Sequence, residues 1–409
     1  MDKRTYGLLG GRLGHSYSPE IHAAFGDYEY RLFEMPEEEV APFLASDRFE
    51  AINVTIPYKK TVMPYLAEIS DEAKKIGSVN TITRLPGGGL RGDNTDYYGF
   101  SYMLDDAGIA VEGRKCLILG SGGASMTAIA VVSDRGGTPV VISRSGENNY
   151  ENISRHADAD VIINTTPVGM YPNNGESPVD LSVFPHLSGV VDMIYNPRCT
   201  ALILQAQRMG SPAASGLSML VAQAKRAAEL FFGHPFPDSL IAEAEKKVRA
   251  QKENIVLIGM PGCGKSVAGQ ALAEKLGFTF ADTDDEIQRI DGRHPAVIIR
   301  EDGEDAFRKI EHEAAKNLGK RSGCVIATGG GVVTRPENYD PLHQNGTIVF
   351  LTRPLEELAT KDRPLTAAHG VQALYEARLP LYEKWADAAA ACTPDPAKTA
   401  EAILAAMGR

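Results

Sequence analysis

Gly120-Ser121-Gly122-Gly123-Ala124-Ser125 and Gly259-Met260-Pro261-Gly262-Cys263-Gly264-Lys265-Ser266 are the two stretches that decide the fold of this chain. Each follows a short apolar run and opens a helix-like segment. Amides at a helix N-terminus face phosphate groups, so such turns bind nucleotides in α/β folds. The first has the spacing of a dinucleotide-binding turn, and the second is a complete Walker A loop, Gly-x4-Gly-Lys-Ser. We therefore expect two separate nucleotide-binding modules in one chain.

The length and composition agree with several globular domains. The chain has 409 residues, 43% of them apolar and 23% charged, and a net charge of −11. An acidic balance argues against non-specific binding to nucleic acid or to an anionic membrane. The sequence shows no signal-peptide core and no run long enough to span a bilayer. Five scattered cysteines without a Cys-x-x-Cys pattern suggest reduced thiols, so we expect a cytoplasmic protein.

Strand-like and helix-like segments alternate along the chain, which predicts α/β architecture with mostly parallel sheets. Pro86-Gly87-Gly88-Gly89 is expected to be a hairpin turn, and the charged stretch Lys246–Glu253 a helix end with a short linker. The fold class expected is a substrate-binding α/β domain plus a Rossmann-like domain, followed by a P-loop NTPase domain like the nucleoside-monophosphate kinases. The expected boundaries are residues 1–100 with 217–250, 101–216, the linker 246–253, and 254–409.

The dinucleotide turn predicts its own cofactor. Gly120, Gly122 and Ser125 occupy the three small-residue places, and the amides of Gly123 and Ala124 start the helix. The next strand ends in Ser143-Arg144 rather than in an acidic residue that would bind ribose hydroxyls. A cation without the acid suits a 2′-phosphate, so NADP is favoured over NAD.

Residues 5–250 carry a second set of ordered motifs, and through them this part resembles shikimate dehydrogenases. The motifs are His15-Ser16-Tyr17-Ser18-Pro19, Asn53-Val54-Thr55-Ile56-Pro57-Tyr58-Lys59, Val79-Asn80-Thr81, Gly92-Asp93-Asn94-Thr95-Asp96, Asn164-Thr165-Thr166, Asp192-Met193-Ile194-Tyr195-Asn196-Pro197 and Gly216-Leu217-Ser218-Met219-Leu220-Val221-Ala222-Gln223.

The resemblance implies NADPH-dependent reduction of 3-dehydroshikimate. Hydride delivery to a ring ketone builds negative charge on oxygen, which a positioned ammonium group can protonate. Lys59 is the candidate, and Asp96 would orient it and a substrate hydroxyl. The remaining substrate-binding candidates offer hydroxyls to a carboxylate or amides to ring hydroxyls: Ser16, Ser18, Thr55, Asn80 and Gln223. One departure is that Glu147-Asn148 stands near the place where relatives often carry a second arginine, which predicts a weaker NADP preference.

The Walker A loop assigns roles in the second half. Its amides, from Gly259, Gly262, Cys263 and Gly264, would wrap phosphates. Lys265 would reach the β- and γ-phosphates of ATP, and Ser266 would ligate Mg²⁺.

Residues 254–409 resemble shikimate kinases in the motifs that follow this loop. These are Asp282-Thr283-Asp284, Asp302-Gly303-Glu304 with Phe307-Arg308, Thr328-Gly329-Gly330-Gly331, Arg363-Pro364-Leu365 and Arg378-Leu379-Pro380-Leu381-Tyr382.

The kinase resemblance implies a role for each matching residue. Asp284 contacts substrate hydroxyls and acts as base, and Asp282 helps to hold magnesium. Arg308 and Arg378 clamp the substrate carboxylate, a bidentate task that suits guanidinium groups. Gly329, Gly330 and Gly331 let the backbone approach the ring. Arg363 belongs to a lid, about Leu355–Thr366, which lacks the further arginine that many relatives place before Arg-Pro-Leu.

The two resemblances support each other, because the product of the first reaction is the substrate of the second. The chain is therefore expected to be a bifunctional dehydrogenase–kinase of aromatic amino-acid biosynthesis that uses NADP(H), ATP and Mg²⁺. A quinate-preferring dehydrogenase joined to a gluconate-type kinase is the alternative, and a catalytically inactive regulatory module is another. Oligomeric state, the placement of the modules and substrate channelling do not follow from the sequence.

Overall fold

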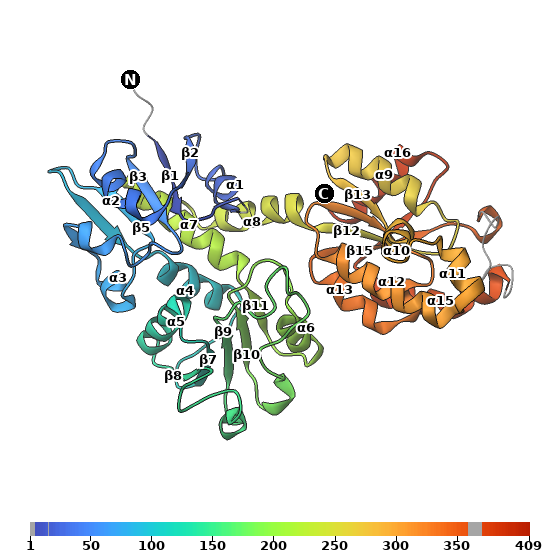
Figure 1. Cartoon of the computed structure of the whole chain (residues 1–409), viewed down its shortest axis with the longest axis horizontal. Coiled ribbons are helices and arrows are strands. Elements are labelled where there is room, and N and C mark those ends of the chain that lie inside the picture. The colour runs from blue at the N-terminus through green and yellow to red at the C-terminus, as the bar shows by residue number, and fades with distance from the viewer. Residues whose placement is uncertain (1–4, 15, 359–369) are drawn as a thin grey trace. The chain divides into compact units, whose positions relative to one another are not determined.

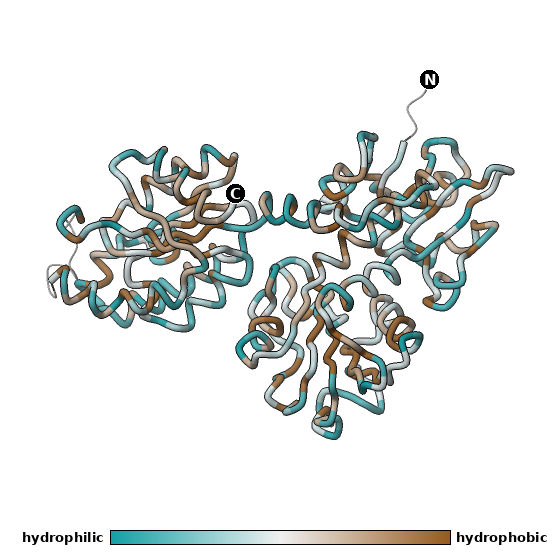
Figure 2. Tube along the Cα trace, turned by 180° about the vertical axis from the view of Figure 1, so that it is seen from behind, coloured by the Kyte–Doolittle hydropathy of each residue, from teal (hydrophilic) through white to brown (hydrophobic). Residues whose placement is uncertain are grey.

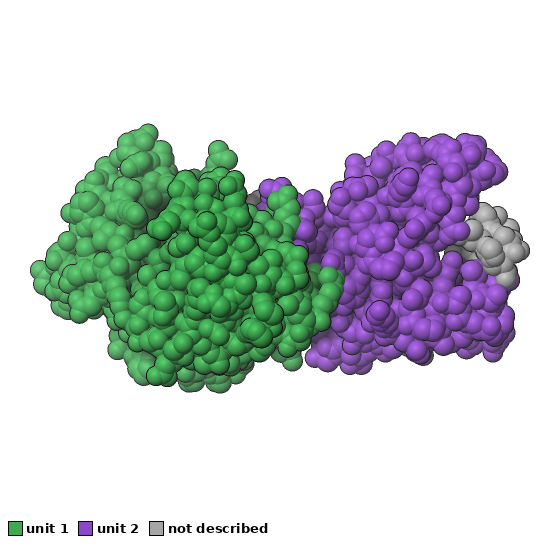
Figure 3. All heavy atoms as spheres, turned by 90° about the horizontal axis from the view of Figure 1, so that it is seen from below, with its two compact units in different colours: residues 1–170, 176–195, 202–248 green, residues 171–175, 196–201, 249–409 purple. Residues whose placement is uncertain are grey.

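The computed structural model describes residues 5–14, 16–358 and 370–409. They form two compact units, which Figure 3 colours separately. The first unit contains residues 1–170, 176–195 and 202–248, and the second contains 171–175, 196–201 and 249–409. The boundary at 248/249 lies inside one continuous helix, α8 (Ser239–Lys252). Most of the stretch predicted as a linker is therefore helical.

The first sheet of unit 1 has six strands in the order β2-β1-β3-β5-β6-β4 (Figure 1). β1 pairs in parallel with β2 and β3, whereas β5 is antiparallel to both of its neighbours. The β5–β6 hairpin is the one predicted from the glycine-rich turn, so that prediction is confirmed. The strands are β1 (Tyr6–Gly10), β2 (Tyr30–Glu34), β3 (Ala51–Val54), β4 (Glu68–Ile69), β5 (Thr81–Arg84) and β6 (Leu90–Asp93).

The second sheet of unit 1 is wholly parallel, with the order β11-β10-β9-β7-β8. β8 lies on one side of β7, and the next strand, β9, lies on the other side. The loops after β7 and β9 therefore flank a topological switch point, which is where α/β sheets bind ligands. The strands are β7 (Lys115–Leu119), β8 (Thr138–Ile142), β9 (Val161–Asn164), β10 (Gly189–Asp192) and β11 (Ala213–Ser215).

Helices α4 and α7 pack against each other between the two sheets of this unit (Figure 1). Gly99 on α4 permits the close crossing, because a Cβ there would lie 2.6 Å from the Met219 carbonyl oxygen of α7. The unit's α-helices are α1 (Ser18–His22), α2 (Glu37–Ala45), α3 (Asp71–Ile76), α4 (Asp96–Asp106), α5 (Gly123–Asp134), α6 (Ala201–Arg208) and α7 (Leu217–Phe232), with α8 after them. Its short 3-10 helices are η1 (Met63–Tyr65), η2 (Ile153–His156) and η3 (Leu181–Val183).

Unit 2 is built on one parallel sheet in the order β13-β14-β12-β15-β16. Helices cover both faces, with α9 and α16 on one and α13 and α15 on the other (Figure 1). Its strands are β12 (Asn254–Ile258), β13 (Thr279–Asp282), β14 (Cys324–Ala327), β15 (Gly346–Thr352) and β16 (Ala388–Ala391). Its helices are α9 (Lys265–Leu276), α10 (Thr283–Asp291), α11 (Pro295–Asp302), α12 (Glu304–Gly319), η4 (Val332–Thr334), η5 (Pro336–Asn338), α13 (Tyr339–His343), η6 (Leu355–Glu357), α15 (Val371–Trp385) and α16 (Pro396–Ala406).

Apolar segments coincide with the strands of each sheet, and hydrophilic segments with loops and outer helix faces (Figure 2). The central strands β7 and β12 are almost fully buried. Continuous apolar runs of this kind are expected where helices cover both faces of a parallel sheet. The predicted α/β class with three sheet-bearing parts is confirmed.

Candidate active sites

Unit 1 contains a cavity of about 380 Å³ whose wall includes all the residues predicted to bind or turn over the first substrate. Strand ends, the β1–α1 loop and the start of α4 meet there with α7. The predicted residues in the wall are Ser16, Ser18, Thr55, Lys59, Asn80, Asp96 and Gln223. Further wall residues include Arg12, Tyr17, Asn53 and Tyr195.

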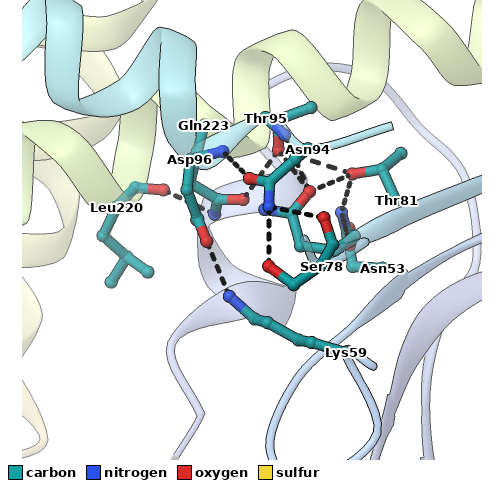
Figure 4. Close-up of polar contacts among 10 residues, drawn as sticks. Asn53, Lys59, Ser78, Thr81, Asn94, Thr95, Asp96, Leu220 and Gln223 are labelled. Carbon is teal, nitrogen blue, oxygen red and sulfur yellow. Dashed lines mark hydrogen bonds and ion pairs between the residues drawn. The ribbon is translucent and has the colours of Figure 1, made fainter. Parts of the chain in front are cut away.

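Lys59 and Asp96 form an ion pair at this cavity, with 2.6 Å between Nζ and Oδ2 (Figure 4). Lys59 follows β3 and Asp96 is the first residue of α4, so two separate elements present the pair. Their side chains are 30% and 19% exposed, which leaves both reachable from solvent. The Asp96 amide donates to Asn94 Oδ1 at 3.1 Å and fixes the start of the helix. The geometry provides an ammonium group that is oriented by a carboxylate and still accessible to a ligand.

Asn80 is oriented by three hydrogen bonds to its side-chain carbonyl oxygen. The Thr95 amide donates at 2.8 Å, and the hydroxyls of Thr81 and Thr95 donate at 3.0 and 3.2 Å. Because Oδ1 is engaged, the amide nitrogen of Asn80 is the end of the side chain that can donate to a ligand.

Gln223 is held across the α4–α7 crossing. Its Nε2 donates to the Leu220 carbonyl oxygen at 2.8 Å, and its Oε1 lies 3.3 Å from the hydroxyl oxygen of Thr95. The NH₂ group carries a second proton, which can serve a ligand without loss of the contact to Leu220.

Sequence reasoning assigned no role to several side chains in this wall, among them Asn53, Tyr195 and Arg12. Asn53 accepts from Tyr30 Oη at 2.8 Å and donates to Thr81 Oγ1 at 3.1 Å, so it supports the hydrogen bonds around Asn80. Tyr195 packs against Tyr17 with ring centroids 5.3 Å apart, and burial raises its pKa. Asn53 and Tyr195 lie inside motifs through which the first half resembles shikimate dehydrogenases, and that position could have identified them as site residues. Arg12 lies just outside one, so no motif points to it.

The dinucleotide turn takes the expected shape after β7. Gly120 has φ = 105°, and a Cβ there would lie 2.9 Å from Thr165 Oγ1, so both conformation and space require glycine. Gly122 is the N-cap of α5, and Ala124 lies in the first turn. A Cβ on Gly122 or Gly123 would meet no atom within 4 Å, which leaves an open surface in front of the helix N-terminus.

Ser143 and Arg144 follow β8, next to this turn. The Ser143 amide donates to the Asn148 carbonyl oxygen at 3.1 Å, and Arg144 is exposed. Asn152 Nδ2 donates to the Glu147 carbonyl oxygen at 2.8 Å, so asparagine side chains organise the loop in which relatives often have a second arginine.

In unit 2 the Walker A loop connects β12 to α9 in the predicted way. Gly259, Gly262 and Gly264 all have positive φ, at 146°, 80° and 105°. Lys265 is 7% exposed, and its ammonium donates to the carbonyl oxygens of Gly259 and Met260 at 2.9 and 3.0 Å. Cys263 is fully buried beneath the loop, with Sγ 3.8 Å from Lys265 Nζ. The loop thus holds a cation at its centre through its own backbone.

Ser266, Asp282 and Asp284 meet at the mouth of this loop. Ser266 Oγ donates to Asp282 Oδ2 at 2.6 Å, and the Asp284 amide donates to Asp282 Oδ1 at 2.9 Å. Hydroxyl and carboxylate oxygens are the donors that Mg²⁺ prefers, so this group suits that ion.

Arg308 lies at a buried position on α12, with 4% of its side chain exposed. It donates to Glu304 Oε1 at 2.8 Å and to Glu311 Oε2 at 2.7 Å. Burial raises the pKa of Glu311, and the nearby positive charge of Arg308 opposes that effect. Glu311 was missed by sequence reasoning, although it lies one helical turn beyond Arg308. A Cβ on Gly331 would lie 2.2 Å from Arg308 Nη2, which explains this glycine.

Arg378 on α15 approaches the same region, and its Nη1 donates to the Gly330 carbonyl oxygen at 3.2 Å. The Tyr382 hydroxyl donates to that oxygen as well. Gly330 packs on Pro261 of the Walker A loop, and a Cβ on Gly329 would lie 3.8 Å from Asp284 Oδ1. The glycine triplet therefore joins the predicted acceptor residues to the phosphate loop. Arg363 and most of its lid lie outside the described residues.

The fold and the two sites define a class of protein, namely a Rossmann-type reductase joined to a P-loop kinase. The family model "Shikimate dehydrogenase substrate binding domain" matches residues 8–82, and "Shikimate kinase" matches residues 261–408. Shikimate dehydrogenase (NADP(+)) of Clostridium beijerinckii is 39% identical over 247 residues, which are 55% of this chain and 91% of that protein.

Solved structures give the same result for the first half. A chorismate mutase/shikimate 5-dehydrogenase fusion protein from Clostridium acetobutylicum is 38% identical with a TM-score of 0.58, covering 61% of this chain and 97% of the other. Shikimate 5-dehydrogenase from Thermus thermophilus, in complex with NADP(H) and shikimate, is 28% identical with a TM-score of 0.55, covering 60% and 99%.

The chain belongs to the shikimate dehydrogenase family through its first half and carries a shikimate kinase domain in its second. It is a bifunctional enzyme of aromatic biosynthesis with an oxidoreductase and a kinase part, as predicted. The matches do not favour the quinate and gluconate-type alternative. None of the helices in the described part of the chain is long and apolar enough to cross a membrane.

Proposed function

We propose that the first half reduces 3-dehydroshikimate to shikimate with NADPH, and that the second half phosphorylates shikimate with ATP. The observation that carries the proposal is the Lys59–Asp96 pair, which lies at 2.6 Å in a cavity that also contains Ser16, Ser18 and Asn80. The relatives are NADP-dependent shikimate dehydrogenases, which suggests the substrate and the cofactor, and the chemistry of the cavity agrees with both.

In the first reaction, Lys59 donates a proton to the carbonyl oxygen of the substrate while hydride adds to the carbonyl carbon. Asp96 orients the ammonium group of Lys59, and it accepts a hydrogen bond from a ring hydroxyl. Solvent then reprotonates Lys59, which is 30% exposed. Ser16, Ser18 and Thr55 donate hydroxyl protons to the carboxylate, and the amides of Asn80 and Gln223 bind ring hydroxyls.

The residues around the dinucleotide turn fit NADPH, which supplies the hydride when bound. Open space at Gly122 and Gly123 lets the pyrophosphate approach the amides that start α5, including that of Ala124. Gly120 forms the turn itself, and Ser143 with Arg144 holds the 2′-phosphate.

In the second reaction, Asp284 accepts the proton of the attacking hydroxyl, and Arg308 and Arg378 bind the carboxylate of the substrate. Gly329, Gly330 and Gly331 provide the surface beneath the ring. Amides of Gly259, Gly262, Cys263 and Gly264 surround the phosphates, and Lys265 and Arg363 neutralise the charge of the phosphate being transferred. Ser266 and Asp282 would hold Mg²⁺, which shields the phosphate oxygens when bound.

The division of labour along the chain follows from these roles. Residues 1–100 with 217–250 bind the first substrate, residues 101–216 bind NADPH, residues 246–253 form the connection, and residues 254–409 form the kinase. The substrates are small molecules, and a net charge of −11 opposes a nucleic-acid or membrane partner. A cytoplasmic location suits the five free thiols.

One coupled assay tests the proposal. The whole enzyme is given 3-dehydroshikimate, NADPH and ATP–Mg²⁺, and shikimate 3-phosphate, NADP⁺ and ADP are quantified together. We expect one NADP⁺ and one ADP for each phosphorylated product, and shikimate should accumulate when ATP is omitted. NADPH oxidation without shikimate formation, or ADP formation that does not depend on shikimate, would contradict the assignment.

A further inference from the structure

Among the described residues that line the unit 1 cavity, one cationic side chain has no partner. Among its described wall residues, the charged side chains are Arg12, Lys59 and Asp96. Lys59 and Asp96 neutralise each other at 2.6 Å. Arg12 is exposed, and no hydrogen bond or ion pair of its side chain occurs among the residues that the structure describes. The net charge of the described cavity wall is therefore carried by Arg12.

The segment that carries Arg12 is held in place on the β1–α1 loop. The Leu13 amide donates to Glu34 Oε2 at 2.8 Å, which ties the residue after Arg12 to the end of β2. The Ser16 amide donates to the Leu13 carbonyl oxygen at 3.0 Å. This hydrogen bond ties Ser16, whose hydroxyl is assigned to the substrate carboxylate, to the residue that follows Arg12. Arg12 and Ser16 both line the cavity.

The substrate is an anion, and the protein has a net charge of −11. The hydroxyls of Ser16, Ser18 and Thr55 are neutral donors, and hydrogen bonds to a carboxylate are stronger when the donor is also charged. A cation at the rim of a site also raises the rate at which an anion arrives. We propose that Arg12 is a further substrate-binding residue of the dehydrogenase, which binds the carboxylate and selects anionic over neutral substrates. This inference rests on the proposed reduction of 3-dehydroshikimate.

The test uses Arg12→Gln in the whole enzyme and measures the oxidation of shikimate by NADP⁺. Two substrates are compared, shikimate and its uncharged methyl ester. Arg31→Gln is the matched control, because Arg31 is an exposed arginine of the same unit that does not line the cavity. Both variants change the net charge equally, so an effect of the overall field would appear in both.

We expect Arg12→Gln to lower kcat/KM for shikimate about fivefold to tenfold at low salt, chiefly through KM, as for a charge at the rim of a binding site. The methyl ester should lose less than about twofold, since it has no charge for Arg12 to recognise. The wild-type kcat/KM for shikimate should also fall more steeply with salt than that of the variant. Arg31→Gln should match the wild type.

An equal loss for shikimate and its ester would overturn the inference, as would equal effects of the two variants or parallel salt dependences. Failure of the proposed function itself looks different, because the wild-type enzyme would then not oxidise shikimate. Arg12→Lys keeps the charge and should restore most of the lost kcat/KM, and a lysine variant as weak as the glutamine variant would also count against a role of the charge.

Discussion

The two lysines on which the two sites depend are held in contrasting ways. In unit 1, Lys59 is paired with a carboxylate, Asp96, at the wall of a cavity, and it is 30% exposed. In unit 2, Lys265 is 7% exposed and is bound by the backbone carbonyl oxygens of Gly259 and Met260. The ammonium group of Lys59 thus has an ionisable partner and is accessible to solvent. The ammonium group of Lys265 is hydrogen-bonded to carbonyl groups of its own loop and is almost inaccessible to solvent.

The contrast follows from what each group has to do. A proton donor must lose its proton in each turnover and regain it, so it needs solvent access and a partner that stabilises the charged form. A group that only stabilises phosphate charge must stay in place, and the hydrogen bonds to the carbonyl oxygens of Gly259 and Met260 hold the Lys265 ammonium there. The same side chain therefore serves acid–base chemistry in one half and fixed electrostatics in the other.

Of the substitutions that test this contrast, the replacement of Lys59 should change an enzymatic rate the most. Lys59→Ala should lower dehydrogenase kcat by about 10²–10⁴-fold, the usual contribution of a positioned acid. The kinase rate of the same preparation should remain near that of the wild type, since the Lys59–Asp96 pair belongs to the dehydrogenase unit. Lys60→Ala is the control, because Lys60 is the neighbouring, exposed lysine. A loss below about tenfold would contradict a proton-transfer role.

Replacing Lys265 tests the other half. Lys265→Ala should lower the phosphoryl-transfer rate by about 10²–10³-fold, as for the loss of one preorganised donor to a developing charge. Dehydrogenase kinetics should not change. Lys275→Ala on the same helix is the control, since Lys275 is exposed and paired with Glu401. If the Lys265 variant regained its rate at high pH, an ionising group would be involved and the contrast with Lys59 would fail.

The motif residues were predictable because each motif fixes its own local geometry. Gly120 and Gly259 each predict a turn that only glycine can form. The spacing from Gly259 to Lys265 in the Walker A loop determines where the ammonium group lies. The β5–β6 hairpin followed from the glycine-rich turn Pro86-Gly87-Gly88-Gly89. In these places the information lies within a few consecutive residues.

Other features of the two sites depend on packing between segments that are distant in the sequence. Asn80 is oriented by Thr95, which also contacts Gln223 from another helix. Glu311 matters because α12 places it against Arg308 at a position where its side chain is fully buried. Arg12 could be identified only from the cavity, whose described charged wall residues are Arg12 and the paired Lys59 and Asp96. No local spacing encodes these relations, so the structure was needed to find them.

Lowering the pH should separate the two halves without a mutation in either site. His22 is 1% exposed, and burial lowers its pKa to about 3, while a hydrogen bond to Asn53 acts in the opposite direction. Between pH 6.5 and 3 the unfolded chain binds a proton that the folded unit does not, so stability is present above pH 6.5 and is lost as the pH falls. At pH 5 this loss amounts to about 2 kcal/mol.

Residual dehydrogenase and kinase activity after incubation in graded urea, at pH 7.5 and pH 5, measures the effect on each half. The urea midpoint for loss of dehydrogenase activity should fall at pH 5, and His22→Gln should reduce that fall. An equal fall in the wild type and the variant would show that other groups cause it.

The smallest effect concerns cofactor choice, because it depends on one exposed charge. Arg144→Ala should raise KM for NADPH about tenfold, the size of one charge-assisted contact, and should leave KM for NADH nearly unchanged. Only NADPH carries the 2′-phosphate, so the ratio of the two effects isolates that contact from general damage to the turn. The loop beyond Arg144 has Glu147 and Asn148 where relatives often have a second arginine. An increase in KM for NADPH above about tenfold would therefore mean that Arg144 alone carries the contact that two arginines share in those relatives. Equal losses with NADPH and NADH would show that Arg144 does not bind the 2′-phosphate. Glu147→Arg provides the reverse experiment, since a second cation in the same loop should lower KM for NADPH and leave NADH unaffected.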